Sequence, residues 1–219
     1  MRLRSHLLSA GGGTIMLLPA ITLAACGALL GGGGTADLYE FGATEASQAA
    51  PSAAITTATS TIRVAFPGAT FPPAIDNRIL TVHGTRASYI ANSRWVASAP
   101  ELFDAALVRS FERNAPELSI SHSNQIQLSD FVLLVDVWRF EAQYVGGEKA
   151  PPEILVNARV RLVRRSDRAT IGEWSVGTNE AADANRVTSI VTAFDRATKT
   201  VTADVANHVR YAIRPDGRP

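Results

Sequence analysis

The sequence predicts an α+β domain, a mainly antiparallel sheet with two helices packed on one face, after a flexible N-terminal tether. Three observations support this fold class. A dense apolar run between Asp130 and Tyr144 indicates a long strand that is partly buried on both faces. The segments 100–114 and 186–210 have apolar residues at helical spacing, before and after that β region. A Gly-, Ala-, Ser- and Thr-rich stretch within residues 26–60 buries too little apolar surface to fold alone.

Residues 1–25 have the order of a cleaved secretory signal peptide. Arg2 and Arg4 form a basic start, an apolar run follows at 14–23, and small residues end it. The apolar run is about a dozen residues long, whereas a membrane-spanning helix needs about 20. We therefore expect a signal peptide and not a membrane anchor helix.

The end of this segment, Leu23-Ala24-Ala25-Cys26-Gly27, resembles a lipobox, the cleavage motif of bacterial lipoproteins. The resemblance implies a diacylglyceryl thioether on Cys26, cleavage before it, and acylation of the new amine. Several acyl chains together anchor a protein stably, whereas one chain binds a membrane marginally. The alternative is an ordinary cleaved signal followed by a small buried cysteine. Cys26 is the only cysteine of the chain, which favours the lipoprotein interpretation.

The charge of the mature chain argues against nucleic-acid binding, and its cysteine content excludes an intrachain disulfide. Removal of residues 1–25 leaves 19 basic and 20 acidic residues, so the formal charge changes from +1 to −1. A near-neutral chain has no general attraction to nucleic acid, and we expect none as a partner. No second cysteine exists for an intrachain disulfide, so packing of one hydrophobic core must stabilise the domain.

The expected tether, residues 26–60, contains two low-complexity stretches, 28–35 and 43–60. The glycine run inside the first stretch is not a phosphate loop, because no Lys-Ser or Lys-Thr follows it. Between the stretches, Tyr39 and Phe41 alternate with polar residues. This alternation predicts a short strand near 38–41 that adds to the edge of the sheet.

The expected domain, residues 61–213, has the order β-β-β-α-β-β-β-β-α. A strand stopped by Pro67 is followed by two strands paired around a turn at 84–86. Pro100 starts the first helix, and Pro116 follows its end. The expected elements are strands at 61–66, 77–83 and 88–96, a helix at 100–114, a strand or turn end at 119–123, strands at 130–144, 153–165 and 169–177, and a helix at 186–210.

Alternation assigns two faces to the long strand at 130–144. One face carries Val132, Leu134, Trp138, Phe140 and Tyr144, and the other carries Phe131, Leu133, Val135 and Val137 before becoming polar. The three tryptophans Trp95, Trp138 and Trp174 are predicted to pack in the core or against the sheet.

The sequence contains no convincing catalytic constellation. None of the histidines His6, His83, His122 and His208 has another histidine four residues away, so no metal-binding helix is expected. The hydroxyls around His122 are adjacent in sequence, whereas a nucleophile and its base normally meet in space. Asp136, inside an apolar strand, is a candidate for a perturbed carboxylate, although a hydrogen bond to a neighbouring strand is the more common arrangement. We expect no enzyme, no metal and no cofactor.

The body of the chain resembles the ABC-type transport auxiliary lipoprotein family, the PqiC-like lipoproteins that accompany lipid transporters with MCE domains. The resemblance covers nearly the whole mature chain, and one departure is the end of the last helix, which has Tyr211 where the family commonly has Trp. The residues that carry it are Tyr39–Phe41, Asp76–Ile79, Tyr89–Val96, Ala99–Phe103, Arg139–Tyr144 and the Ala/Val-rich last helix.

The resemblance implies a non-catalytic subunit that works with an MCE-domain protein, a permease and an ATPase to move lipid between the inner and outer membranes. It implies partner contacts by Tyr89, Arg94 and Trp95. Gly27 is not the Asp of inner-membrane retention, so we expect a lipid anchor in the inner leaflet of the outer membrane, facing the periplasm. The alternative is a lipoprotein that regulates envelope assembly or a peptidoglycan synthase. Homo-oligomerisation is left open.

Five arginines make the region 159–168 basic: Arg159, Arg161, Arg164, Arg165 and Arg168. Arg159 and Arg161 share one strand face, where lipid headgroups or an acidic partner would dock. The alternative is a solvated sheet edge whose charges discourage aggregation.

Overall fold

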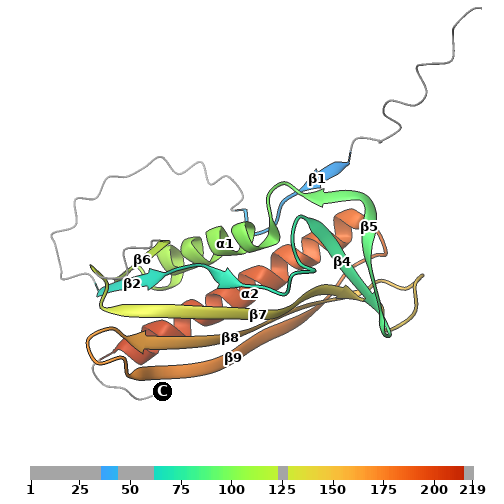
Figure 1. Ribbon diagram of the computed structural model, residues 1–219. Coiled ribbons are helices and arrows are strands. Elements are labelled where there is room, and N and C mark those ends of the chain that lie inside the picture. Colours follow the sequence, from blue (N-terminus) through green and yellow to red (C-terminus); the bar gives the residue numbers. More distant parts are fainter. Residues whose placement is uncertain (1–35, 44–61, 123–127, 215–219) are drawn as a thin grey trace, which may run out of the picture. The chain divides into compact units, whose positions relative to one another are not determined.

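The computed structural model describes residues 36–43, 62–122 and 128–214, which belong to one compact unit. The predicted signal peptide and Cys26 lie outside these residues. The elements follow the expected order, with one short strand, at residues 69–70, added (Figure 1). They are β1 Asp37–Tyr39, β2 Ile62–Phe66, β3 Ala69–Thr70, β4 Arg78–His83, β5 Arg86–Trp95, α1 Ala99–Asn114, β6 Leu118–His122, β7 Phe131–Gln143, β8 Glu153–Arg164, β9 Thr170–Ala181 and α2 Val187–Ile213.

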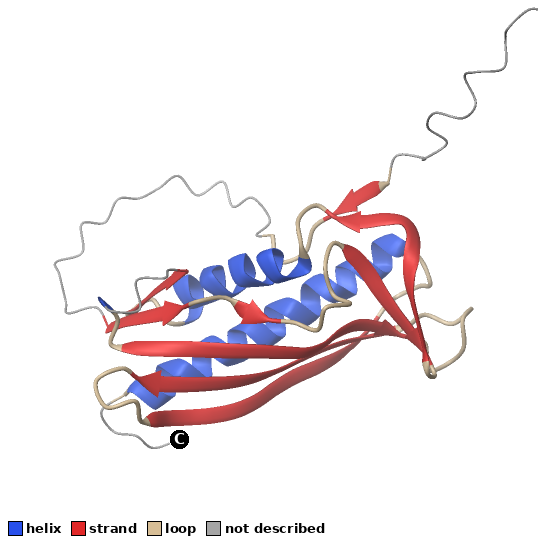
Figure 2. Ribbon diagram, viewed as in Figure 1, coloured by secondary structure: helices blue, strands red, loops and turns tan. Residues whose placement is uncertain are grey.

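One sheet contains all the described strands, and both helices lie on one of its faces, so the predicted α+β fold is confirmed (Figure 2). β7, β8 and β9 form the expected antiparallel meander. The other edge of β7 pairs in parallel with three short strands in turn, β2, β3 and β4. The parallel pairs make the sheet mixed, because α1 carries the chain across before β6 and β7 return alongside β2.

A β-bulge in β7 corrects the predicted faces of this strand. The register passes from Val137 opposite Ala158 to Arg139 opposite Asn157, so Trp138 is an extra residue. The alternation therefore reverses at this point. Leu133, Val135 and Val137 before the bulge, and Phe140 and Ala142 after it, are all buried, whereas Leu134 and Trp138 are exposed. The prediction that Phe140 shares a face with Leu134 and Trp138 was wrong.

A side-chain cap starts α1, and an apolar stripe packs α2 against its neighbours. Ser98 caps α1: its hydroxyl accepts a hydrogen bond from the backbone of Glu101, and the Glu101 carboxylate accepts one from Ser98. α2 has no side-chain cap, and its helical stripe of apolar residues packs against α1, β8 and β9. The buried residues of α2 are Ile190, Ala193, Phe194, Ala197, Thr198, Val201, Thr202, Val205, Ala206 and Val209.

The centre of the core is a cluster of aromatic rings between the sheet and the helices. Phe140 of β7 lies 4.9 Å from Phe194 of α2 and 5.1 Å from Phe41, measured between ring centroids. Trp95 packs edge-on against Phe41 at 4.8 Å and against Phe194 at 5.3 Å. Aromatic pairs in such geometry add about 0.5–1.5 kcal/mol each beyond their buried area. The cluster therefore joins β5, β7, α2 and the segment before β2.

Candidate functional site

Residues 36–43, which we call the strap, connect the anchor side of the chain to the folded domain. β1 within the strap pairs in parallel with β5, so the strand predicted from the alternation of Tyr39 and Phe41 is present. Phe41 is fully buried in the aromatic cluster. The strap is thus part of the compact unit, although the sequence assigned it to the tether and started the domain at residue 61.

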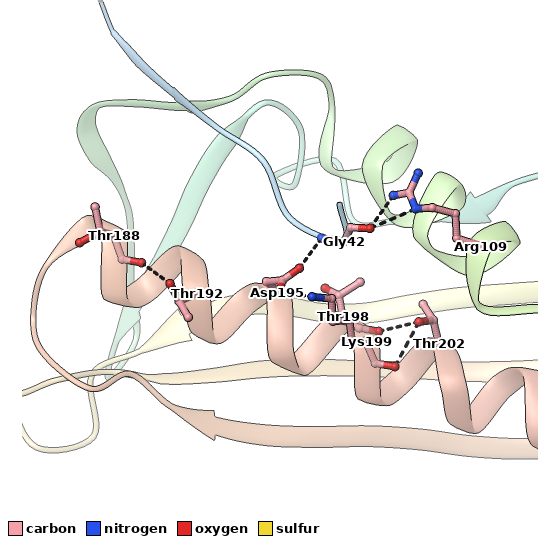
Figure 3. Close-up of polar contacts among 8 residues, drawn as sticks. All are labelled: Gly42, Arg109, Thr188, Thr192, Asp195, Thr198, Lys199 and Thr202. Atoms are coloured by element: carbon pink, nitrogen blue, oxygen red, sulfur yellow. Dashed lines mark hydrogen bonds and ion pairs between the residues drawn. The ribbon is translucent and has the colours of Figure 1, made fainter. Parts of the chain in front are cut away.

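Gly42 holds the strap between the two helices (Figure 3). Its N–H donates to the Asp195 carboxylate of α2 at 2.7 Å, and its carbonyl accepts from the Arg109 guanidinium of α1 at 2.7 and 3.1 Å. Hydrogen bonds to charged groups are stronger than neutral ones, about 1.5–3 kcal/mol each. Lys199 neutralises Asp195 on its other side, at 2.7 Å. The strap is therefore fixed to both helices by one residue.

Only glycine fits at position 42. Its φ of +68° lies in the left-handed region, which L side chains rarely adopt. A Cβ built there would also lie 2.6 Å from the Cβ of Ala106 in α1. No local pattern in the sequence predicts this contact, because Asp195 lies 153 residues away along the chain.

The three predicted partner-contact residues do not form one surface. Trp95 is 2% exposed and belongs to the aromatic cluster, so a direct partner contact by its indole is inconsistent with the structure. Arg94, the preceding residue of β5, points to the opposite face of the sheet and is exposed. Tyr89 is half-buried, and its hydroxyl donates to the carbonyl of Ala74 at 3.0 Å.

Arg78, Tyr89 and Arg94 lie together where the pairing of β4 with β5 becomes irregular, and we call them the arginine corner. The Arg78 guanidinium carbon lies 3.6 Å from the centre of the Tyr89 ring, a cation–π contact. Arg78 is the register partner of Arg94, and the pairing then shifts so that Leu80 opposes Tyr89. The positive φ of Asn92, 51°, accommodates the irregular backbone of β5 between these two positions.

The face of the sheet opposite the helices carries the basic strand predicted from the sequence. Arg159 and Arg161 are both exposed on β8, and both lie near the Glu173 carboxylate of β9, at 3.9 and 3.4 Å. They border an open groove of about 660 Å³ that Leu134 also lines. Farther along β7, the exposed Trp138 borders a second, shallower hollow. This face combines paired charges with exposed apolar side chains, a composition typical of protein contacts.

The geometry gives no support for a catalytic role of Asp136, and the side chain of His122 and residue Ser123 lie outside the described part of the structure. Asp136 is exposed, and its carboxylate accepts a hydrogen bond from the Thr70 hydroxyl at 2.8 Å. This is the inter-strand hydrogen bond that the alternative reading of Asp136 predicts. No cluster of His, Cys, Asp or Glu suited to a metal ion occurs in residues 36–43, 62–122 and 128–214.

The pKa values of two titratable groups are shifted from their ordinary values, and both shifts have structural causes. The backbone N–H of Ala169 donates to the Asp167 carboxylate, and with Arg164 it lowers the pKa of that carboxyl. Partial burial raises the pKa of the Tyr144 phenol, whose hydroxyl donates to Asn185 at 2.9 Å. Both groups lie in or beside loops at the ends of β strands, where they stabilise local structure.

Comparison with known proteins decides the family. Residues 44–206 match the model of the ABC-type transport auxiliary lipoprotein component. The chain belongs to this family. No helix in the described part of this auxiliary lipoprotein is both long and apolar enough to cross a membrane. The search of curated proteins found no match to the sequence.

Solved structures share the fold of this auxiliary lipoprotein. Protein XCC0632 from Xanthomonas campestris is 19% identical with a TM-score of 0.62, and the match covers 71% of this chain and 89% of that one. An uncharacterised protein is 11% identical with a TM-score of 0.59, over 68% of this chain and 92% of that one. Identities this low establish the fold alone.

Proposed function

We propose that this auxiliary lipoprotein is a non-catalytic subunit of an MCE-type ABC transporter that moves lipid between the inner and outer membranes. Cys26 carries its lipid anchor, and the outer membrane is its location, with the domain in the periplasm. Its protein partners are an MCE-domain protein and the permease and ATPase of the transporter. Family membership supports the transport role.

The observation that carries this proposal is the arrangement of the strap and the uncovered sheet face. The strap, which follows the anchor segment along the chain, is fixed to both helices through Gly42. The helices cover one face of the sheet, and none of the described elements covers the other, which we call the free face (Figure 2). Leu134 and Trp138, 41% and 46% exposed, give that face apolar contact area beside Arg159 and Arg161. We assign the protein partner to this face.

Affinity purification of the full lipoprotein from native membranes, followed by mass spectrometry, tests the proposal. We expect an MCE-domain protein and its ABC subunits to co-purify. Trp138→Ala is expected to weaken this recovery several-fold, because buried aromatic anchors contribute most to interfaces. Tyr211→Ala is the matched control, since Tyr211 is a similarly exposed aromatic at the end of α2. Recovery of only a cell-wall synthase or an outer-membrane assembly barrel contradicts the proposal.

The same experiment tests the earlier assignment of Tyr89 and Arg94 to a protein partner. Their substitution reduces recovery of the transporter if they contact it, and leaves recovery unchanged if they do not. The proposal leaves the oligomeric state open. Multi-angle light scattering of the purified lipoprotein measures its molar mass and so tests whether it forms a homo-oligomer.

A further inference from the structure

A row of three side chains crosses adjacent strands at the strap end of the sheet. Leu38 of β1 is the parallel register partner of Arg94 in β5, and Arg94 is the antiparallel partner of Arg78 in β4. Directly paired residues project from the same face, with Cβ atoms about 4.5–5.5 Å apart. The neighbouring pair Tyr39 and Trp95 points to the opposite, helix-covered face. The row therefore lies on the free face.

The two arginines of this row have no carboxylate partner among the described residues. Arg78 stacks on Tyr89, and Arg94 donates to the amide oxygen of Asn77 at 3.4 Å, so both contacts are with neutral groups. Elsewhere the fold pairs many of its arginines with acids. Those arginines are Arg63, Arg86, Arg139, Arg159, Arg161, Arg164, Arg196 and Arg210.

Like charges directly opposite each other on neighbouring strands destabilise a sheet. Arg78 and Arg94 are in this position, and Tyr89 holds the Arg78 guanidinium in place by stacking. Asp76, two residues before Arg78, forms no ion pair with either arginine. An anion that binds both guanidiniums would remove the repulsion, and guanidinium groups match the geometry of phosphate oxygens.

Exposed apolar side chains flank the two arginines. Leu38 is 63% exposed and Val96 is 53% exposed. Val96 directly follows β5 and is held beside β1, because its N–H donates to the carbonyl of Tyr39 at 2.8 Å. Basic side chains beside exposed apolar ones are the composition by which proteins bind the surface of anionic membranes.

The lipid anchor keeps this end of the domain near a bilayer. Ala36, the first described residue, is only ten positions after Cys26. Ten residues span at most about 35 Å when fully extended. Arg78 lies three residues before Thr81, the parallel partner of Ala142, so it is level with Arg139 of β7. From there to Phe131, whose partner Arg164 leads into the β8–β9 hairpin with Arg168, is about eight residues, or roughly 25 Å at about 3.3 Å per residue. Because Leu38 of the strap is the register partner of Arg94, the arginine corner is the basic cluster nearer to the anchor.

We propose that Arg78 and Arg94 bind the phosphate of an anionic phospholipid headgroup in the membrane that holds the anchor, with Leu38 and Val96 against the interface. This rests on the lipid attachment in the proposed function, and it gives the arginine corner a lipid ligand. The contact orients the domain, so that the Arg168 end projects away from the bilayer. It is separate from the transporter contact assigned to Trp138.

A fluorescent label tests the proposal in the mature lipoprotein reconstituted into vesicles. Cys26 is the only cysteine and is lipidated, so Val96→Cys supplies the one free thiol for an environment-sensitive fluorophore. Vesicles contain phosphatidylcholine with or without phosphatidylglycerol, and acrylamide is the quencher because it is neutral. We expect a blue-shifted emission and several-fold slower quenching with phosphatidylglycerol only. High salt is expected to reverse both, because it screens the attraction.

Substitutions identify the groups responsible. Arg78→Gln and Arg94→Gln are each expected to lower the docked-to-free ratio roughly fivefold, the usual effect of one basic residue at an anionic membrane. Arg168→Gln makes the same charge change at the far hairpin and is expected to have no effect. Arg94→Lys is expected to retain much of the docking.

Three results overturn the proposal: equal quenching in neutral and anionic vesicles, an equal loss in Arg168→Gln, or the full emission shift with inorganic phosphate and no vesicles. The last result would assign the corner to a free anion. None of them bears on co-purification of the transporter, so failure of this inference and failure of the proposed function are distinguishable.

Discussion

Gly42→Ala tests whether the strap is fixed to the domain as the structure indicates. The substitution places an L side chain at φ +68°, which costs about 1–2 kcal/mol. Its Cβ also meets the Cβ of Ala106 at 2.6 Å, and relieving such overpacking costs typically about 1–3 kcal/mol. Moving the backbone to relieve the contact weakens the hydrogen bonds to Asp195 and Arg109. We expect a total loss of about 3–5 kcal/mol in the free energy of unfolding.

Gly84→Ala is the matched control. Gly84, in the β4–β5 turn, has φ +59°, and an added Cβ would meet nothing within 4 Å. It therefore isolates the backbone strain, and we expect a loss of about 1–2 kcal/mol. Urea unfolding followed by circular dichroism and tryptophan fluorescence measures both variants. With a slope of about 2 kcal/mol/M, the midpoint falls by roughly 1.5–2.5 M for Gly42→Ala and 0.5–1 M for the control. Equal losses in the two variants would refute the close approach of the strap to α1.

Three further predictions follow from burial and hydrogen bonding. Phe41→Ala is expected to lower the free energy of unfolding in urea by about 3–5 kcal/mol, because Phe41 is fully buried. Leu38, three residues earlier, is exposed, and Leu38→Ala is expected to change that free energy by less than about 0.5 kcal/mol. Similar losses in the two variants would contradict the burial of the strap. The buried Thr198 hydroxyl has no hydrogen-bond partner in the described part, so Thr198→Val is expected to stabilise the protein by about 1 kcal/mol. Thr202→Val removes a 2.9 Å hydrogen bond and is not expected to stabilise it. A lower melting temperature for both variants would refute this prediction. Because the pKa of Asp167 is lowered in the folded state, its carboxylate contributes stability above about pH 4 that is lost as the pH falls. Asp167→Asn is therefore expected to flatten the acid limb of the stability–pH curve. An unchanged acid limb would contradict the assignment of this stability to Asp167.

The alternation of apolar and polar residues predicted that β7 is a strand, but it did not predict which face each side chain occupies. The alternation in residues 130–144 predicted a central, two-faced strand, and the structure confirms the strand. It assigned Phe140 and Trp138 to one face, because the pattern has no signal for an extra residue at Trp138. Similarly, Arg94 and Trp95 were grouped as partner contacts, although adjacent strand residues point to opposite faces of a sheet.

The sequence alone determined what depends on local signals. The apolar spacing of the two helices, the stop at Pro67, the order of the strands and the alternation of Tyr39 and Phe41 are all encoded within a few residues. The resemblance to the auxiliary lipoprotein family was also visible in short motifs, and the family match confirms it.

Only the tertiary structure decided how distant segments meet. Gly42 contacts Arg109 and Asp195, which lie 67 and 153 residues away, and Arg78 lies opposite Arg94 through a hairpin with an irregular register. Trp95 is buried because Phe41, Phe140 and Phe194 surround it from three other parts of the chain. Such contacts depend on which faces of the sheet and helices become covered, and periodicity along one segment contains no information about the residues that cover it.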